Sequence, residues 1–221
     1  MEITRRNLLT STVATIGLFG ATSAFGRIEK ACRVTPVQPE GPFYPVRDQL
    51  DKDNDLTFVE GHTGNAHGTI IYLQGVVSDS SCKPIGNAVV EIWQACATGR
   101  YNHPGDAESQ SPLDSNFQYW GISTTNDQGR YHFKTIIPGH YKADADWIRP
   151  PHIHFKVHKL GYHELITQMY FAGNQYNDGD LILQKLTEEQ KKDVIVTPVK
   201  RASSNLEEYD CAFNVTLTRV R

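Results

Sequence analysis

The feature that most constrains the fold is a series of short apolar runs, rich in β-branched and aromatic residues, that starts at Thr69. Several runs alternate apolar and polar residues with a period of two, which is typical of strands that bury one face. Turn signals separate the runs at spacings that favour an antiparallel sandwich over strand-helix-strand units. The sequence therefore predicts an all-β, antiparallel β-sandwich with one short helix over residues 186–194. The expected strands lie in residues 69–77, 87–96, 130–136, 152–160, 164–171 and 211–220.

Residues 1–26 have the pattern of a secretory signal peptide. A basic start precedes an apolar stretch over residues 8–20, and small residues lead to a plausible cleavage position at Ala24. The apolar stretch is shorter than the roughly 20 residues that a membrane-spanning helix needs. Arg5 and Arg6 stand side by side before it, as in twin-arginine signals. We expect an exported, periplasmic protein with no membrane span after the signal is removed.

The rest of the chain divides into an N-terminal arm over residues 27–67 and one domain over residues 68–221. Pro and Gly punctuate the arm, which predicts long loops. The formal net charge of −3 comes from 22 basic and 25 acidic residues without a basic block, so we expect no nucleic-acid partner. The cysteines match no zinc pattern, and they either form disulfides in one of three complete schemes or remain buried thiols. They are Cys32, Cys82, Cys96 and Cys211.

Histidine and tyrosine are the side chains that the composition favours as metal ligands. The chain has 10 Tyr and 9 His beside 2 Met and 4 Cys, so metal chemistry would use oxygen and imidazole more than sulfur. The sharpest local pattern is RPPHIHF, residues 149–155. If this segment is a strand, His152 and His154 share one face and can bind one metal ion, but two ligands are too few.

Two sets of additional ligands remain open at this point. Tyr101 lies in GRYNH just after an expected strand, and Tyr141 lies in IIPGHY after a Pro-Gly turn. A ferric ion with two phenolates and one hydroxide has no net charge, which lowers the cost of burying it. Alternatively, Asp144 or Asp146 would complete the two-histidine, one-carboxylate site of a zinc hydrolase.

Five segments carry a family resemblance: VEIWQACATGRYNH, DSNFQYWG, GRYHFKTIIPGHY, WIRPPHIHF and LITQMYF. They occur in the order, and close to the spacing, of the intradiol ring-cleavage dioxygenases, and most resemble the protocatechuate 3,4-dioxygenase β subunits. The fold implied is a transthyretin- or immunoglobulin-like sandwich. The resemblance also implies a non-haem ferric iron, Fe(3+), with hydroxide in the fifth position and Tyr141 as the ligand released when a catechol binds. The four implied iron ligands are Tyr101, Tyr141, His152 and His154.

Five other positions take roles through the same resemblance. Arg149 matches an active-site arginine that stabilises negative charge on the substrate ring, and its alternative role is a structural ion pair. Gln168 would orient Arg149 or the oxygen-derived group, or would satisfy backbone groups. Trp93 would lie beside an iron ligand, either as packing or in contact with the substrate. The segment TPVQPEGPF resembles the opening of the partner α subunit, which places Gly41 and Pro42 near the substrate, on this chain or on a neighbouring copy.

The activity implied is cleavage of a catechol-type ring between its two hydroxyl carbons with O2, giving a cis,cis-muconate-type diacid. A protocatechuate-like substrate is favoured, because the residues upstream of Thr69 are too few for the long helical segment of catechol 1,2-type relatives. We also expect a homo-oligomer. Two alternatives stay open: a zinc hydrolase, and a non-catalytic exported binding module, because GVVSDSSCKPIGNAVVEI also resembles the opening strands of transthyretin-like domains.

Overall fold

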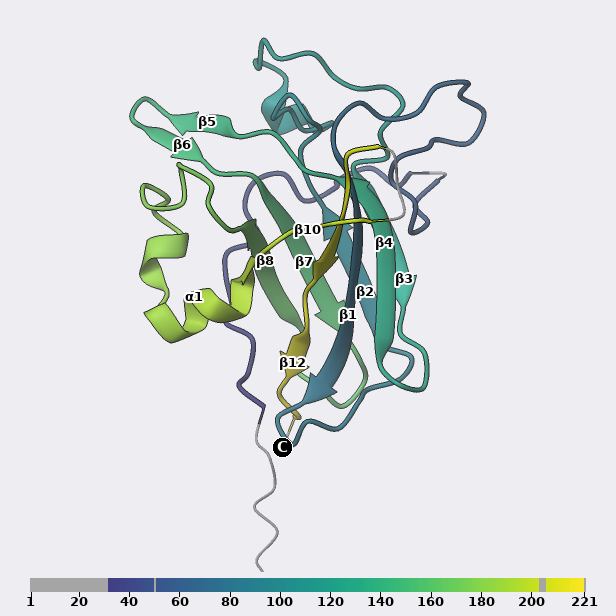
Figure 1. Ribbon diagram of the computed structural model, residues 1–221, viewed down its shortest axis with the longest axis vertical. Coiled ribbons are helices and arrows are strands. Elements are labelled where there is room, and N and C mark those ends of the chain that lie inside the picture. Colours follow the sequence, from purple (N-terminus) through teal and green to yellow (C-terminus); the bar gives the residue numbers. More distant parts are fainter. Residues whose placement is uncertain (1–31, 50, 203–205, 221) are drawn as a thin grey trace, which may run out of the picture.

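Two packed sheets and a small hairpin make up the computed structural model, which describes residues 32–49, 51–202 and 206–220 (Figure 1). The first sheet contains β10 (Val199–Lys200), β11 (Glu208–Ala212), β1 (Ile70–Asp79) and β12 (Val215–Leu217), with β4 (Arg130–Ile136) on the other edge of β1. The second sheet contains β3 (Trp120–Thr124), β2 (Val89–Trp93), β7 (His152–His158), β8 (Leu165–Phe171) and β9 (Ile195–Val196). The hairpin pairs β5 (Tyr141–Asp144) with β6 (Trp147–Arg149). The predicted all-β sandwich is confirmed.

The core lies between the two sheets, where alternate side chains of each strand meet. Phe155 of β7 is fully buried, and its ring centroid lies 4.7 Å from that of Phe213 and 6.2 Å from that of Tyr131 in β4. Because successive side chains of a strand point to opposite faces, each sheet also has an outer face, which points away from this core. Other fully buried core residues include Ile71, Leu73, Ile92, Ile153 and Met169.

The strand directions differ in part from the expected antiparallel pattern. Strands β2, β3, β7 and β8 pair antiparallel, whereas β1 pairs parallel with β11 and β12, and β8 pairs parallel with β9. The prediction of a single strand over residues 211–220 is wrong. It is interrupted where the Phe213 N–H donates to the carbonyl of Gln74 and the Asn214 side chain accepts from the Val76 N–H. Strands β3, β5, β6, β9 and β10 were missed because they have five residues or fewer and little alternation.

Helix α1 (Glu188–Val194) confirms the one predicted helix. The Thr187 hydroxyl accepts from the Gln190 backbone N–H, while the Gln190 side chain accepts from the Thr187 N–H, so two donors of the first turn are satisfied. Short 3-10 turns are η1 (Pro104–Asp106) and η2 (Leu183–Lys185). Among the described residues, no helix is long and apolar enough to cross a membrane.

The described part of the N-terminal arm follows the sandwich closely. Cys32 forms a disulfide with Cys82, which resolves the open pairing, and Cys96 and Cys211 are buried free thiols. The arm then runs past the second sheet, where the Gln38 N–H donates to the carbonyl of Ile166 in β8. It is therefore bonded to the main chain of β8, and it reaches the outer face of the sheet at Gly41, where a Cβ would lie 3.4 Å from Cε1 of His154. The predicted signal peptide, residues 1–26, lies outside the described residues.

Candidate functional site

Strand β7 places two buried imidazoles on the outer face of the second sheet. His152 and His154 are each 2% exposed, and their Nε2 atoms lie 3.2 Å apart. The residue between them, Ile153, points into the core, as the alternation of a strand requires. His154 is opposite Trp93 on β2 and Gln168 on β8, so both neighbouring strands frame the pair. The predicted His-x-His geometry is present.

The hydrogen bonds of the histidines leave ring nitrogens free to act as ligands. The Nδ1 atom of His152 lies 2.6 Å from the carbonyl oxygen of Pro150. Because a carbonyl can only accept, Nδ1 carries the proton and Nε2 keeps a lone pair. Burial lowers the pKa of His152 and His154 well below the usual value, and Arg149 lowers it further. Both rings are therefore neutral at pH 7, which is the form that binds metals.

Two tyrosines complete the cluster. The Tyr101 hydroxyl lies 3.4 Å from Nε2 of His152, and the rings of Tyr101 and Tyr141 are 5.6 Å apart and nearly perpendicular. Gly99, with φ of +84°, makes this approach possible because a Cβ there would lie 2.1 Å from the carbonyl oxygen of His140. The loop after β2 thus packs against the start of β5. The structure brings together all four predicted metal ligands.

Burial disfavours the charged form of both phenols. It raises the pKa of Tyr101 well above its usual value, and neighbouring Tyr141 raises it further. Burial also raises the pKa of Tyr141, although the Arg149 guanidinium opposes this effect. Either phenolate would need a cation close to its oxygen to form at neutral pH. Two neutral imidazoles and two phenols that ionise beside a cation form a donor set suited to a hard metal ion.

Arg149 lies beside this cluster and is 3% exposed. Its Nε donates to Asp180 at 2.7 Å, and its Nη2 donates to the Gln168 side-chain oxygen at 2.5 Å. Its Nη1 lies 3.5 Å from the Tyr141 hydroxyl, because β6 pairs Arg149 with Tyr141 across the hairpin. Arg149 and Gln168 are therefore adjacent to each other and to one of the tyrosines. Arg149 makes an ion pair and also faces the site.

The arm of the same chain covers the site. The Gln168 side chain donates to the carbonyl of Pro39 at 2.7 Å, and a Cβ built on Gly41 would lie 3.4 Å from Cε1 of His154. Pro42 follows and is exposed, and Phe43 stacks on Tyr101 with ring centroids 4.5 Å apart. The segment containing Gly41 and Pro42 is thus supplied in cis.

Trp93 packs behind one of the histidines. Its indole ring is 1% exposed and stacks on His154, with centroids 4.7 Å apart and an interplanar angle of 11°. Its Nε1 and the Nδ1 of His154 have no hydrogen-bond partner among the described residues. Trp93 therefore holds the orientation of His154, and its predicted substrate contact stays a prediction.

The carboxylates of the zinc alternative do not join the histidines. Asp144 and Asp146 are exposed on the β5–β6 hairpin and its turn. Within the described residues, no group of three or more His, Cys, Asp and Glu side chains could hold a metal ion. The oxygen donors that do approach the histidines come from tyrosine.

Three residues near Arg149 were missed by the sequence analysis. Asp180 is fully buried against Arg149, and Tyr170 places its hydroxyl 3.4 Å from Arg149 Nη2. Gln38 accepts from the Tyr170 hydroxyl at 3.0 Å. The sequence signals were weak, because Asp180 lies in a stretch typical of turns and Gln38 lies in the Pro-rich arm.

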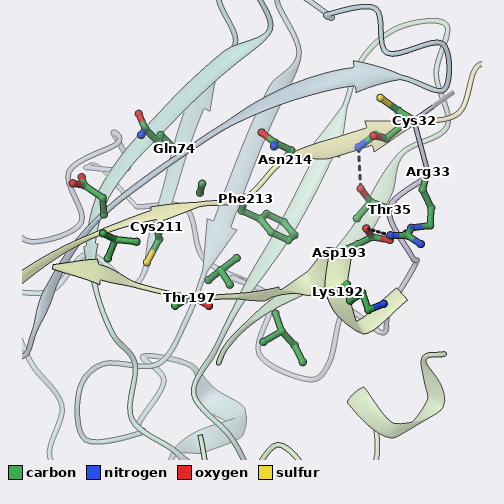
Figure 2. A pocket seen from close by; sticks show the side chains of 16 residues that line it. Cys32, Arg33, Thr35, Gln74, Lys192, Asp193, Thr197, Cys211, Phe213 and Asn214 are labelled. Atoms are coloured by element: carbon green, nitrogen blue, oxygen red, sulfur yellow. Dashed lines mark hydrogen bonds and ion pairs between the residues drawn. The ribbon is translucent and has the colours of Figure 1, made fainter. Parts of the chain in front are cut away.

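Of the cavities around the described residues, one lies away from this cluster and another borders it. One, of about 740 Å³, opens between the start of the arm, α1 and the C-terminal strands, where Arg33 reaches Asp193 (Figure 2). None of the predicted site residues lines it. The other, of about 500 Å³, borders Tyr101 and Trp93 and is also lined by Arg100. The histidine pair itself lies beneath the arm and lines neither cavity.

Comparison with known proteins gives consistent matches. A family model described as "Dioxygenase" matches residues 39–219. A protocatechuate 3,4-dioxygenase beta chain of Burkholderia cepacia is 39% identical over 160 residues, which cover 71% of this chain and 67% of that protein. A catechol 1,2-dioxygenase of Candida albicans is 32% identical over 157 residues, covering 65% of this chain and 47% of that protein. The chain thus spans about half the length of this second relative.

Solved structures agree with the fold. The catechol 1,2-dioxygenase of Pseudomonas arvilla C-1 superposes with a TM-score of 0.64 at 25% identity, covering 85% of this chain and 63% of that one. An intradiol ring-cleavage dioxygenase of Tetranychus urticae gives a TM-score of 0.66 at 23% identity, covering 86% of this chain and 97% of that one. At 23% identity, the match to the Tetranychus urticae structure supports the fold alone.

Proposed function

This chain belongs to the intradiol ring-cleavage dioxygenases, and we propose that it cleaves a catechol-type ring between its two hydroxyl carbons, with O2 and a non-haem ferric iron. The product would be a cis,cis-muconate-type diacid that contains both atoms of O2. The observation that carries the proposal is the convergence of two neutral imidazoles and two phenols beneath the arm.

The residues present fit a ferric ion. Tyr101, Tyr141, His152 and His154 would hold it, because Nε2 of His152 keeps a lone pair and lies 3.2 Å from Nε2 of His154 and 3.4 Å from the Tyr101 hydroxyl. Two phenolates and a hydroxide would balance the charge of the ion, so that a buried site carries no net charge. When bound, the ion would supply the Lewis acidity and electron-accepting capacity that activate a chelated catechol.

Tyr141 is the tyrosine better placed to hold a proton from the substrate. It is partly exposed, whereas Tyr101 is 4% exposed and stacked under Phe43. The Tyr141 oxygen, 3.5 Å from Nη1 of Arg149, would hold a proton taken from the substrate hydroxyl. Tyr101 would stay in place, because its backbone N–H donates to the Asp106 carboxylate at 2.7 Å.

Arg149 would bind and stabilise the electron-rich ring. A guanidinium keeps its charge at all relevant pH values, and in a buried site that charge acts strongly on negative charge that develops nearby. Gln168 holds one Nη of Arg149 and so orients it. Gly41 leaves space next to His154, while the arm around it excludes water from the site.

We propose a substituted, protocatechuate-like catechol as the substrate. The supporting observation is the higher identity to the relative named as a protocatechuate 3,4-dioxygenase beta chain, 39% against 32% for the Candida albicans catechol 1,2-dioxygenase. We also propose that the chain is exported through its predicted signal and forms a homo-oligomer. The Cys32–Cys82 disulfide supports an oxidising compartment.

The test is iron content with a visible spectrum, followed by oxygen uptake with a panel of catechols. We expect one iron per chain, a tyrosinate-to-iron(III) charge-transfer band that weakens in Tyr101→Phe and is lost when Tyr141 is also replaced by Phe, and uptake with at least one catechol. Bound zinc and a colourless protein would favour the hydrolase instead. Iron without uptake on any catechol would reject the dioxygenase function, and protein that binds no metal would favour the non-catalytic module.

A further inference from the structure

The turn before η2 buries a carboxylate that the proposed reaction does not use. Asp180 is fully buried. One of its oxygens accepts the backbone N–H groups of Ile182 at 3.0 Å and Leu183 at 2.6 Å. The other accepts from Nε of Arg149 at 2.7 Å. Because both oxygens are engaged, the carboxylate has a single orientation relative to the main chain.

That orientation determines where the Arg149 guanidinium points. A guanidinium is planar and rigid, so fixing Nε fixes the directions of both Nη groups. Nη1 then faces the Tyr141 hydroxyl, and Nη2 faces Gln168 and the Tyr170 hydroxyl. These three partners are neutral side chains in this network, and Asp180 is the one carboxylate that forms an ion pair with Arg149 among the described residues.

We infer that Asp180 is a positioning residue of this site: it holds Arg149 so that the guanidinium faces the place where negative charge develops on the substrate. The inference rests on the proposed function. Among the described residues Asp180 has no hydrogen bond to the four candidate ligands, so its bonded contact with the site is Arg149, although its charge also raises the pKa of Tyr141. An ion pair that only stabilised the fold would not need the Nη groups to face the site.

The first sheet provides a matched control. Asp79, at the end of β1, is 4% exposed and accepts the backbone N–H groups of Ser81 and Lys83, each at 3.0 Å. Its second oxygen accepts from Nε and Nη2 of Arg219 at 3.3 and 3.1 Å. Asp79 therefore makes a set of bonds similar to that of Asp180, with one more from its arginine, and Arg219 is exposed and faces no part of the candidate site.

The experiment compares Asp180→Asn with Asp79→Asn in the iron-loaded full-length protein. In Asp180→Asn the amide N–H group would face Nε–H of Arg149, two donors together, so the guanidinium should rotate away. We expect kcat to fall about 10- to 100-fold, the range for losing an outer partner of a metal site. KM, iron content and the charge-transfer band should change far less. Asp79→Asn should lower Tm and leave kcat unchanged.

A double-mutant cycle shows whether Asp180 acts through Arg149. In an Arg149→Gln background, adding Asp180→Asn should change kcat by no more than about 2-fold, because the guanidinium is already absent. The double variant has no buried charge, so it remains testable if either single variant, which leaves one member of the ion pair unpaired, folds poorly. An equal loss in both backgrounds, or wild-type kcat in a folded Asp180→Asn protein, would overturn the inference.

A readout without activity separates this inference from the proposed function. In the ¹⁵N NMR spectrum of the metal-free protein, the Nε–H of Arg149 should be protected from exchange, and Asp180→Asn should remove that protection. Rapid exchange in the wild type would count against the inference whatever the activity. Failure of the wild type to consume oxygen with any catechol would instead reject the proposed function and leave the NMR result standing.

Discussion

The same tripeptide, His-Phe-Lys, occurs in β4 of the first sheet and in β7 of the second, and only the second copy belongs to the candidate site. Phe133 and Phe155 at its centre both point into the core, at 1% and 0% exposed. The preceding histidines differ, because His132 is exposed and His154 is 2% exposed. The strand pattern is the same in both sheets, so the difference comes from what covers the outer face.

The arm provides that cover on one sheet only. On the second sheet it places Gly41 against His154, and Tyr44 hydrogen-bonds to the buried Glu91 at 3.0 Å. On the first sheet its contacts include Asp55 with Lys134 of β4 at 3.2 Å and the Thr35 N–H with the carbonyl of Thr216 in β12 at 3.2 Å, and His132 stays exposed. Burial beneath the arm is what keeps the imidazoles neutral and makes charge on the tyrosines depend on a metal. The outer face of a strand therefore becomes a candidate site where the arm buries it.

The largest expected effect comes from replacing His154, with the same replacement of His132 as the control. His154→Ala should abolish stoichiometric iron binding and lower oxygen uptake by more than about 100-fold, because losing a ligand costs more than losing an outer partner. His132→Ala should leave both unchanged and shift the free energy of unfolding by no more than about 0.5 kcal/mol. Metal analysis and an oxygen electrode measure these effects. Equal iron content in the two variants would contradict the site.

Opening the disulfide at the start of the arm should be the next largest effect. Cys32 and Cys82 are 50 residues apart, so the chain-entropy model gives a loss of about 4 kcal/mol in unfolding free energy for a Cys32→Ser, Cys82→Ser variant. Denaturant titration measures it, with and without a reductant. The reductant should lower the stability of the wild type and leave the variant unchanged, because Cys96 and Cys211 are already thiols. A reductant effect on the variant would argue against this assignment.

Replacing Gly41 by alanine adds a methyl group beneath the arm and tests how closely the arm approaches the site. Gly41 and Gly61 both have positive φ, +77° and +83°, so alanine is strained at either position by about 1–2 kcal/mol. A Cβ at Gly41 meets His154, whereas a Cβ at Gly61 has nothing within 4 Å. Because the distance of 3.4 Å between a Cβ at Gly41 and His154 is an ordinary contact, Gly41→Ala should lower kcat/KM by no more than about 10-fold, and Gly61→Ala should not lower it. Steady-state kinetics that show the same loss in both variants would assign the effect to strain.

The smallest effect concerns the anchor between arm and sheet. Tyr44→Phe removes the hydroxyl that donates to Glu91 and should lower the unfolding free energy by about 1 kcal/mol. It should also speed hydrogen exchange in the arm around Gln38. Tyr72→Phe, on the outer face of the first sheet beneath Arg201, should change stability by less than about 0.5 kcal/mol. Unchanged exchange in the arm of Tyr44→Phe would mean that this bond does not hold it.

Much of the fold and site was predictable because it depends on local periodicity. Alternation identified β2, β4, β7 and β8, and the His-x-His spacing placed His152 and His154 on one face. Their positions in the sequence made Tyr101 and Tyr141 candidate donors, and the family resemblance implied that both are iron ligands. Asp180, Tyr170 and Gln38 were not predicted, because their contacts join residues that are 31, 21 and 132 positions from their partners and no local pattern reports such distances. The parallel pairing of β11 and β12 with β1 was missed for the same reason.

The sequence by itself determined which residues alternate, where the chain turns, and that tyrosine and histidine are its available metal donors, since each follows from residue type and short spacing. The tertiary structure decided which histidines are buried. Which histidines are buried depends on the path of the arm. The Cys32–Cys82 disulfide and the hydrogen bonds of Gln38 to β8 fix that path. Burial and long-range hydrogen bonds set the protonation of the site, and both are properties of the packed chain.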